Sequence, residues 1–144
     1  MSIHIVEEVN AAIVDVWDLV GDFGGLVRWN PFISSCSCNG DGAGALRTVL
    51  TPDGRQIVEQ VEIHDAVAHV LRYRVVSAVP HIPVVGMTVT IALAELGKES
   101  TRIEWDGSLP AEISEAEGFA QSIESSFRAR IDALQKALKA RARS

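Results

Sequence analysis

One carboxylate stands out because the residue pattern places it among apolar side chains. In the alternating stretch 55–64, Glu59 shares a face with three aliphatic residues: Ile57, Val61 and Ile63. A charge on a buried face is costly unless a counter-charge, water or a proton compensates it. Arg47 holds a similar position in the preceding stretch 44–51. We expect Arg47 and Glu59 to meet if the turn at residues 52–54 pairs these two stretches as antiparallel strands.

Three interpretations of such a pair remain open. It is an internal ion pair without function, or it is the polar floor of an apolar pocket that binds a ligand group directly or through water. In the third interpretation Glu59 is a general acid or base, since a carboxyl group in a pocket is suited to that chemistry. Catalysis is the less favoured of the two functional interpretations, because the sequence shows no nucleophile–base pair.

The histidines and cysteines do not add a second chemical centre. His81 lies between two prolines on an expected loop, while the other three histidines, His4, His64 and His69, have no metal-ligand spacing and fit surface positions on strands. Cys36 and Cys38 are two residues apart on an expected strand, so their side chains share a face and favour buried thiols over a disulfide. We expect no metal and no cofactor.

The elements around this pair follow from hydrophobic periodicity. Period-two alternation and turn residues predict strands at residues 3–9, 32–38, 44–51, 55–64, 69–78, 85–95 and 100–109. A short helix is expected from Ala11, capped by Asn10, and a further turn at 26–29 before Pro31. Successive hairpins imply an antiparallel sheet with one buried face.

The last stretch, from Ser114 to about Arg143, predicts one long helix. Ser114 and Glu117 form a capping box, and apolar residues recur at steps of three and four: Phe119, Ile123, Phe127, Ile131, Leu134 and Leu138. The stripe is consistent with a plain core helix. Small residues between Phe119 and Phe127 leave room for a cavity there, facing Tyr73, Val75 and Trp105 on the expected sheet.

Composition restricts the classes of function. The 144 residues fit one domain, 1–144, and 47% hydrophobic with 22% charged residues is typical of a folded protein. The net charge of −6 argues against binding to nucleic acid or an anionic membrane. The sequence shows neither a signal peptide nor a spanning segment, so we expect a cytoplasmic protein without stable membrane insertion.

Short motifs in a fixed order carry a resemblance to a known family. They run Val16-Trp17, Asp22-Phe23-Gly24, Trp29-Asn30-Pro31, Gly44-x-x-Arg47, Gly54-x-x-x-x-Glu59, Asp65, Leu71-x-Tyr73 and Thr101-x-x-x-Trp105. In this order the chain resembles the helix-grip proteins of the START and birch-pollen-allergen superfamily, also called SRPBCC. Within it, the chain is most similar to the polyketide cyclase/dehydrase-like branch. The resemblance implies an α+β fold, a seven-stranded antiparallel sheet wrapped around a long C-terminal helix, with two short helices after the first strand.

The chain also resembles the plant abscisic-acid receptors of this superfamily, at residues 32–37 and at Phe119-Ala120. The resemblance implies a pocket lined by residues at matching positions: Phe32, Arg47, Glu59, Tyr73, Val75, Phe119, Ile123 and Phe127. Asn30 stands where those receptors hold the hormone's carboxylate with a lysine, and their gate loop is shortened here to 51–54. We therefore do not expect an abscisic-acid receptor.

These inferences define the expected site and its function. The candidate ligand-binding residues are Asn30, Phe32, Arg47, Glu59, Tyr73, Val75, Met87, Trp105, Phe119, Ile123 and Phe127, with Glu59 the candidate catalytic residue. We expect a small hydrophobic ligand, such as a lipid, polyketide or isoprenoid-like molecule, in a cavity between sheet and C-terminal helix. The alternatives are a polyketide aromatase/cyclase or dehydratase that uses Glu59 with Arg47 and Tyr73, and a protein–protein module. The sequence leaves homodimer formation open.

Overall fold

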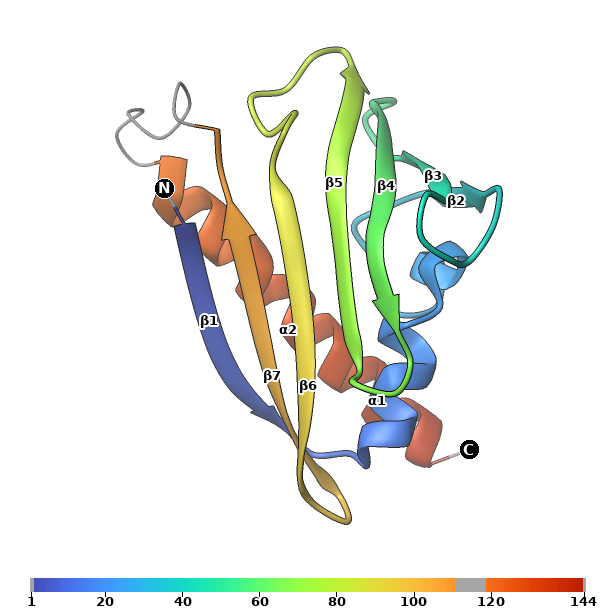
Figure 1. Ribbon diagram of the computed structural model, residues 1–144, viewed down its shortest axis with the longest axis vertical. Coiled ribbons are helices and arrows are strands. Elements are labelled where there is room, and N and C mark those ends of the chain that lie inside the picture. The colour runs from blue at the N-terminus through green and yellow to red at the C-terminus, as the bar shows by residue number, and fades with distance from the viewer. Residues whose placement is uncertain (1, 111–118, 144) are drawn as a thin grey trace.

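One antiparallel sheet holds the long helix against its concave face (Figure 1). The computed structural model describes residues 2–110 and 119–143. Its seven strands are β1 Ser2–Val9, β2 Ser35–Cys38, β3 Leu46–Leu50, β4 Gln56–Asp65, β5 Val70–Val79, β6 Thr88–Gly97 and β7 Ser100–Ser108. Their order in the sheet is β1-β7-β6-β5-β4-β3-β2, with every neighbouring pair antiparallel. This is the predicted α+β helix-grip fold.

Two short helices connect β1 to β2. They are α1 Ile13–Val20 and the 3-10 helix η1 Phe23–Arg28. The predicted cap by Asn10 is wrong: the helix starts two residues later, with Ala12 as the N-cap residue and without a side-chain capping bond. The backbone N–H of Asn10 instead donates to Oε1 of Gln135, 3.4 Å away.

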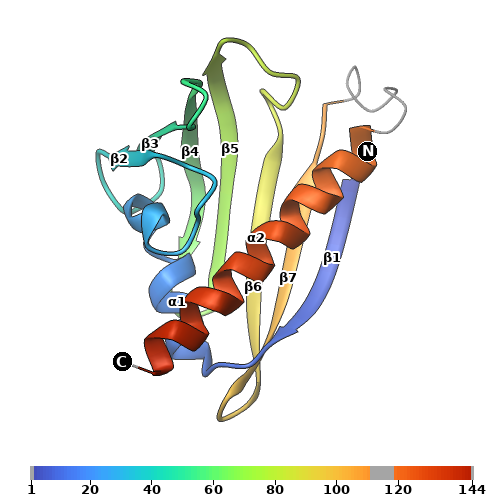
Figure 2. The same cartoon turned by 180° about the vertical axis from the view of Figure 1, so that it is seen from behind.

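Helix α2, Phe119–Ala142, crosses the sheet diagonally and ends beside α1 (Figure 2). Its 24 residues span about 36 Å at roughly 1.5 Å per residue. The predicted apolar stripe is buried from Ile123 to Leu138, and Phe119 at its start is half-buried. The capping box expected at Ser114 and Glu117 lies outside the described residues. No helix in the described ranges is long and apolar enough to cross a membrane.

The strand β4 departs from simple alternation. Its pairing with β5 shifts twice: Val76 of β5 is skipped between Val58 and Glu59, and Glu62 of β4 is skipped between Val61 and Ile63, so only the second shift changes the faces of β4. A bulge of this kind adds one residue to one strand and reverses which face the following side chains take. Ile63, expected on the buried face, is therefore 42% exposed. His64, expected on the outer face, bonds to the carbonyl oxygen of Gly21 at 2.7 Å.

Candidate ligand-binding site

The ion pair expected between Arg47 and Glu59 is present on the inner face of the sheet. The two residues are direct partners in the antiparallel pairing of β3 and β4. Nε of Arg47 donates to Oε1 of Glu59 at 2.7 Å. The Arg47 side chain is 4% exposed and that of Glu59 13%, so the carboxylate is the more accessible partner.

Aromatic rings and a carbonyl group complete the surroundings of Arg47. Its Cζ lies 3.9 Å from the ring centroid of Phe23 and 4.7 Å from that of Tyr73, distances typical of cation–π contacts. Its Nη1 donates to the carbonyl oxygen of Phe23 at 3.1 Å. Burial by itself lowers the pKa of Arg47, but the charge and hydrogen bond of Glu59, together with Tyr73 and Cys36, raise it overall. Arg47 is thus a fixed cation.

Tyr73 adds a neutral hydroxyl group to the same site. Burial, followed by the negative charge of Glu59, raises the pKa of Tyr73 to about 12. The positive charges of Arg47 and Arg130 oppose this rise. The phenol therefore keeps its proton near neutral pH and remains able to donate a hydrogen bond.

A pocket of about 80 Å³ opens beside this group. Apolar side chains from the sheet and from the segment 20–33 form most of its wall: Val20, Leu26, Trp29, Phe32, Ile33, Val49, Ile57, Leu71, Ile91 and Trp105. Its polar lining residues are Asp22, Asn30, Arg47, Thr51, Glu59, Tyr73 and Arg130. A mostly apolar wall with a few polar groups is typical of small-molecule sites.

The mouth of the pocket is shaped by a turn and by α2. The side-chain oxygen of Asn30 accepts a hydrogen bond from the backbone N–H of Phe32 at 2.8 Å, a local bond that fixes the turn. The ring of Phe32, 43% exposed, lies 5.6 Å from the guanidinium carbon of Arg130. The pocket therefore lies between the segment 20–33, the strands β3 to β7, and the turn of α2 that carries Arg130.

Of the eleven expected site residues, six line this pocket and five lie outside it. Asn30, Phe32, Arg47, Glu59, Tyr73 and Trp105 line it, whereas Val75, Met87, Phe119, Ile123 and Phe127 do not. The ring of Phe127 packs on Trp105, with centroids 5.9 Å apart. It also fills the space above Gly107, where an added Cβ would lie 2.7 Å from Phe127 Cε2. A role in ligand binding for these five residues stays a prediction.

Arg130 was not among the expected site residues, although its position in the sequence carries a signal. Arg130 lies three residues after Phe127 and four before Leu134, so helical periodicity puts it on the edge of the buried stripe. The reasoning that identified Glu59, a charge on an apolar face, applies equally to Arg130. The contributions of Leu26, Trp29 and Ile33 depend instead on how η1 and the following turn fold back over the sheet, which residue spacing does not encode.

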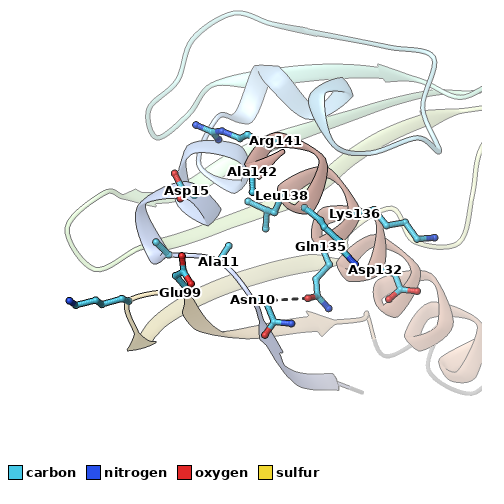
Figure 3. Close-up of a pocket in the computed structure, with 13 residues that line it drawn as sticks. Asn10, Ala11, Asp15, Glu99, Asp132, Gln135, Lys136, Leu138, Arg141 and Ala142 are labelled. Atoms are coloured by element: carbon cyan, nitrogen blue, oxygen red, sulfur yellow. Dashed lines mark hydrogen bonds between the residues drawn. The ribbon is translucent and has the colours of Figure 1, made fainter. Parts of the chain in front are cut away.

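A larger crevice of about 810 Å³ lies along the C-terminal half of α2, between it, the β1–α1 connection and the β6–β7 turn (Figure 3). Side chains of both charge signs surround it: Asp15, Lys98, Glu99, Asp132, Lys136, Lys139 and Arg141. Figure 3 shows the bond between Asn10 and Gln135 on its wall. Arg141 is held by Asp18 at 2.8 Å. Neither Arg47 nor Glu59 lines this crevice. The larger crevice is therefore separate from the pocket that contains the ion pair.

A second polar cluster lies on the strands β1 and β7. His4 and Asp106 are direct cross-strand partners in contact through Nδ1 and Oδ1, and Glu104 lies close by. Each of the three residues has one nitrogen or carboxylate oxygen atom that could bind a metal ion, and these atoms lie within 4.8 Å of one another. Residue spacing could not reveal this cluster, because His4 is about 100 positions from Glu104 and Asp106 and meets them only through strand pairing.

The fold and the lined pocket define a helix-grip protein with a small internal site. A family model described as polyketide cyclase / dehydrase and lipid transport matches residues 2–143, so the chain belongs to this family. The family and the fold support a ligand-binding or cyclase role. No curated protein sequence matches this chain.

Solved structures share the whole fold at low sequence identity. An uncharacterized protein from Bacillus thuringiensis is 24% identical, with a TM-score of 0.83 over 96% of this chain and 98% of its own. The protein XoxI from Bacillus cereus is 27% identical, with a TM-score of 0.77 over 95% and 94%. The di-domain ARO/CYC protein BexL is 13% identical, with a TM-score of 0.79 over 96% of this chain and 46% of BexL.

Proposed function

We propose that this protein binds a small hydrophobic molecule of the lipid, polyketide or isoprenoid kind in the pocket beside Arg47 and Glu59. The observation that carries the proposal is a buried ion pair at the edge of an apolar pocket. Such a pair contributes little to stability compared with apolar packing. Its position at the pocket wall is better explained by contact with a ligand.

The dimensions of the pocket limit how the ligand enters. At about 80 Å³ it is smaller than the roughly 300–1,000 Å³ of sites that enclose a drug-sized ligand. A compact molecule fits inside, and a longer one places only its end there, with the remainder passing the exposed ring of Phe32. The apolar wall supplies affinity, while the few polar groups orient the ligand.

A second candidate function is a polyketide cyclase or dehydratase reaction. It is favoured by the family description and by the accessible carboxylate of Glu59, which lines the pocket near the Tyr73 hydroxyl. In this function Glu59 accepts or donates the proton, while Arg47 holds it in place and Tyr73 donates to a substrate oxygen. Loss of a measured turnover in Glu59→Gln, with substrate binding retained, would place this function first.

Filling the pocket tests the binding proposal. Ile57 lines the pocket and is half-buried, so a larger side chain there occupies the pocket volume without entering the tightly packed core. The dye N-phenyl-1-naphthylamine, which fluoresces more strongly in apolar surroundings, serves as the probe. We expect Ile57→Trp to weaken dye binding by about tenfold or more, because the indole ring occupies the volume that the dye would enter.

The matched control is Ile63→Trp on the same strand, since Ile63 points outward and lines no part of the pocket. It adds the same fluorophore and should leave dye affinity within about twofold of the wild type. The proposal is wrong if the dye does not bind the wild type, or if both variants bind it equally well.

A further inference from the structure

We propose that the pocket selects hydrophobic ligands that carry one anionic oxygen group, which Arg130 binds at the pocket mouth, while the indole N–H of Trp105 donates to the same ligand. A carboxylate is the simplest group of this class. This inference rests on the proposed binding function and specifies the chemistry of its ligand. Arg130 and Trp105 become the residues that determine specificity.

Arg130 has hydrogen-bonding capacity to spare. The half-buried side chain lines the pocket, and its Nη1 donates to the carbonyl oxygen of Ser126 at 3.0 Å and to the Ser126 hydroxyl. Within the part of the chain that the structure describes, no carboxylate forms an ion pair with Arg130. A guanidinium group has five N–H donors in a planar fork that matches a carboxylate. Nε and Nη2 remain able to contact a ligand.

Among the described residues, the charges around the pocket leave one cation uncompensated. The charge of Arg47 is matched by Glu59, and that of Asp22 by Arg28, whose Nη1 lies 3.1 Å from Asp22 Oδ2. Arg130 is then the remaining charged residue of the lining. An anionic group beside it restores the balance, and the partly buried setting strengthens that attraction relative to bulk water.

Trp105 offers a buried donor that lacks an acceptor. The residue is 1% exposed and lines the pocket, and its Nε1 has no hydrogen-bond partner among the described residues. Leaving a buried donor unpaired is costly, and native proteins rarely do so. Because an indole N–H can only donate, its missing partner must be an acceptor.

The other polar groups of the pocket point to the same class of ligand. The Tyr73 phenol keeps its proton, and the side-chain oxygen of Asn30 is already used by the N–H of Phe32. These two side chains can therefore each still offer a ligand a donor, an O–H from Tyr73 and an amide NH₂ from Asn30. The negative charge of Glu59 is already matched by Arg47. A ligand with acceptor oxygens fits this arrangement, whereas a cationic one does not.

Two probes that share a ring system, one anionic and one neutral, test this inference. 2-Naphthoate and 2-naphthylmethanol share one ring system, and their Kd values can be measured by following the ¹H–¹⁵N indole signal of Trp105. The Trp105→Phe variant assigns that signal among the three tryptophans. We expect wild type to bind naphthoate about tenfold or more tightly than the alcohol, with the Trp105 signal shifting for naphthoate.

Arg130→Gln should remove this preference, weakening naphthoate binding by about tenfold or more and changing alcohol binding by less than about twofold. The matched control is Arg128→Gln, the same change of charge on the same helix. Arg128 is exposed, lies 3.5 Å from Glu7 and lines no part of the pocket. Arg130→Lys keeps the charge but not the fork, and should retain intermediate affinity for naphthoate, which keeps the test valid if Arg130→Gln folds poorly.

The outcomes separate this inference from the proposed function. Equal wild-type affinity for both probes overturns the anion preference and leaves hydrophobic binding standing. Binding of neither probe overturns both. Equal losses in Arg128→Gln and Arg130→Gln would show an effect of net charge and contradict a specific site. A Trp105 signal that naphthoate does not move contradicts the role of the indole donor.

Discussion

At the scale of single residues, the structure is built around a cation that the fold has removed from water. Arg47 satisfies its guanidinium group with one carboxylate, one carbonyl oxygen and two aromatic rings. Removing any one of these partners leaves the buried charge of Arg47 with fewer compensating contacts, which lowers the stability of the folded state. The pair therefore orients both side chains, and we expect its removal to change both the free energy of unfolding and ligand binding in the pocket.

A double-mutant cycle on Arg47→Met and Glu59→Gln measures this coupling. Each single change leaves a partner without its counter-charge, and we expect it to lower the free energy of unfolding by about 3–5 kcal/mol. The double variant should lose less than the sum, by about 0.5–3 kcal/mol, because neither charge then remains. Denaturant unfolding gives the four values; additive losses would contradict a direct interaction.

The contact of His4 with Asp106 predicts a pH effect of defined sign. The side-chain hydrogen bond and the charge of Asp106 raise the pKa of His4 above its ordinary value of 6.5. A raised pKa in the folded state means that the interaction stabilises fully below about pH 6.5 and fades as the pH rises through the folded value. Asp106→Asn should lower the His4 pKa, and its stability deficit should shrink at higher pH.

Titration of the His4 ring signals by NMR checks the first effect, and unfolding at several pH values checks the second. Glu8→Gln, also on β1, is a useful control, since the group contacts Ser100 and not His4. An unchanged His4 midpoint in Asp106→Asn would show that the contact does not persist in solution.

The Arg47–Glu59 pair could be predicted from sequence because two facts sufficed. Strand alternation assigned both residues to one face, and a tight turn placed their strands side by side. The position of Arg130 beside the buried stripe could be predicted in a similar way, from helical periodicity. That the indole N–H of Trp105 has no acceptor among the described residues could not be predicted in this way, because it depends on which acceptors the completed core leaves within reach.

At the scale of elements, sequence analysis succeeds where a period is regular and fails where it breaks. Leu71, Tyr73 and Val75 on β5 are buried as alternation predicts. On β4 the second register shift adds Glu62 and reverses the faces of the residues after it, and the strand contains neither glycine nor proline to reveal this bulge. The outward position of Ile63 was therefore not predictable from residue types.

The close approach of α2 to β7 is a packing feature that one substitution can test. A methyl group added at Gly107 would lie 2.7 Å from the ring of Phe127, too close without movement of the helix or ring. We expect Gly107→Ala to lower the free energy of unfolding by roughly 1–3 kcal/mol. At Gly97 the added carbon would lie 3.9 Å from the Ser100 Cβ, an ordinary contact, so Gly97→Ala should cost much less. Equal costs would show that α2 does not pack this closely.

At the scale of the whole molecule, the fold was predictable from the order of its elements, but the position of the pocket was predictable only in part. Small residues beside Phe119 and Phe127 suggested a cavity at the start of α2, whereas the ring of Phe127 fills the space above Gly107. The pocket described here lies under the η1–β2 connection instead. A cavity is the volume left after all side chains have packed, so it depends on the mutual placement of elements distant in sequence.

The central claim is that a hydrophobic ligand binds beside Arg47 and Glu59, and its location is the most direct test. Intermolecular NOEs between N-phenyl-1-naphthylamine and methyl groups of the protein locate the bound dye. We expect NOEs to Val49, Leu71 and Ile91, which line the pocket. NOEs to Leu138 and Ala142 in the crevice at the end of α2, with none to the pocket methyl groups, would contradict the claim.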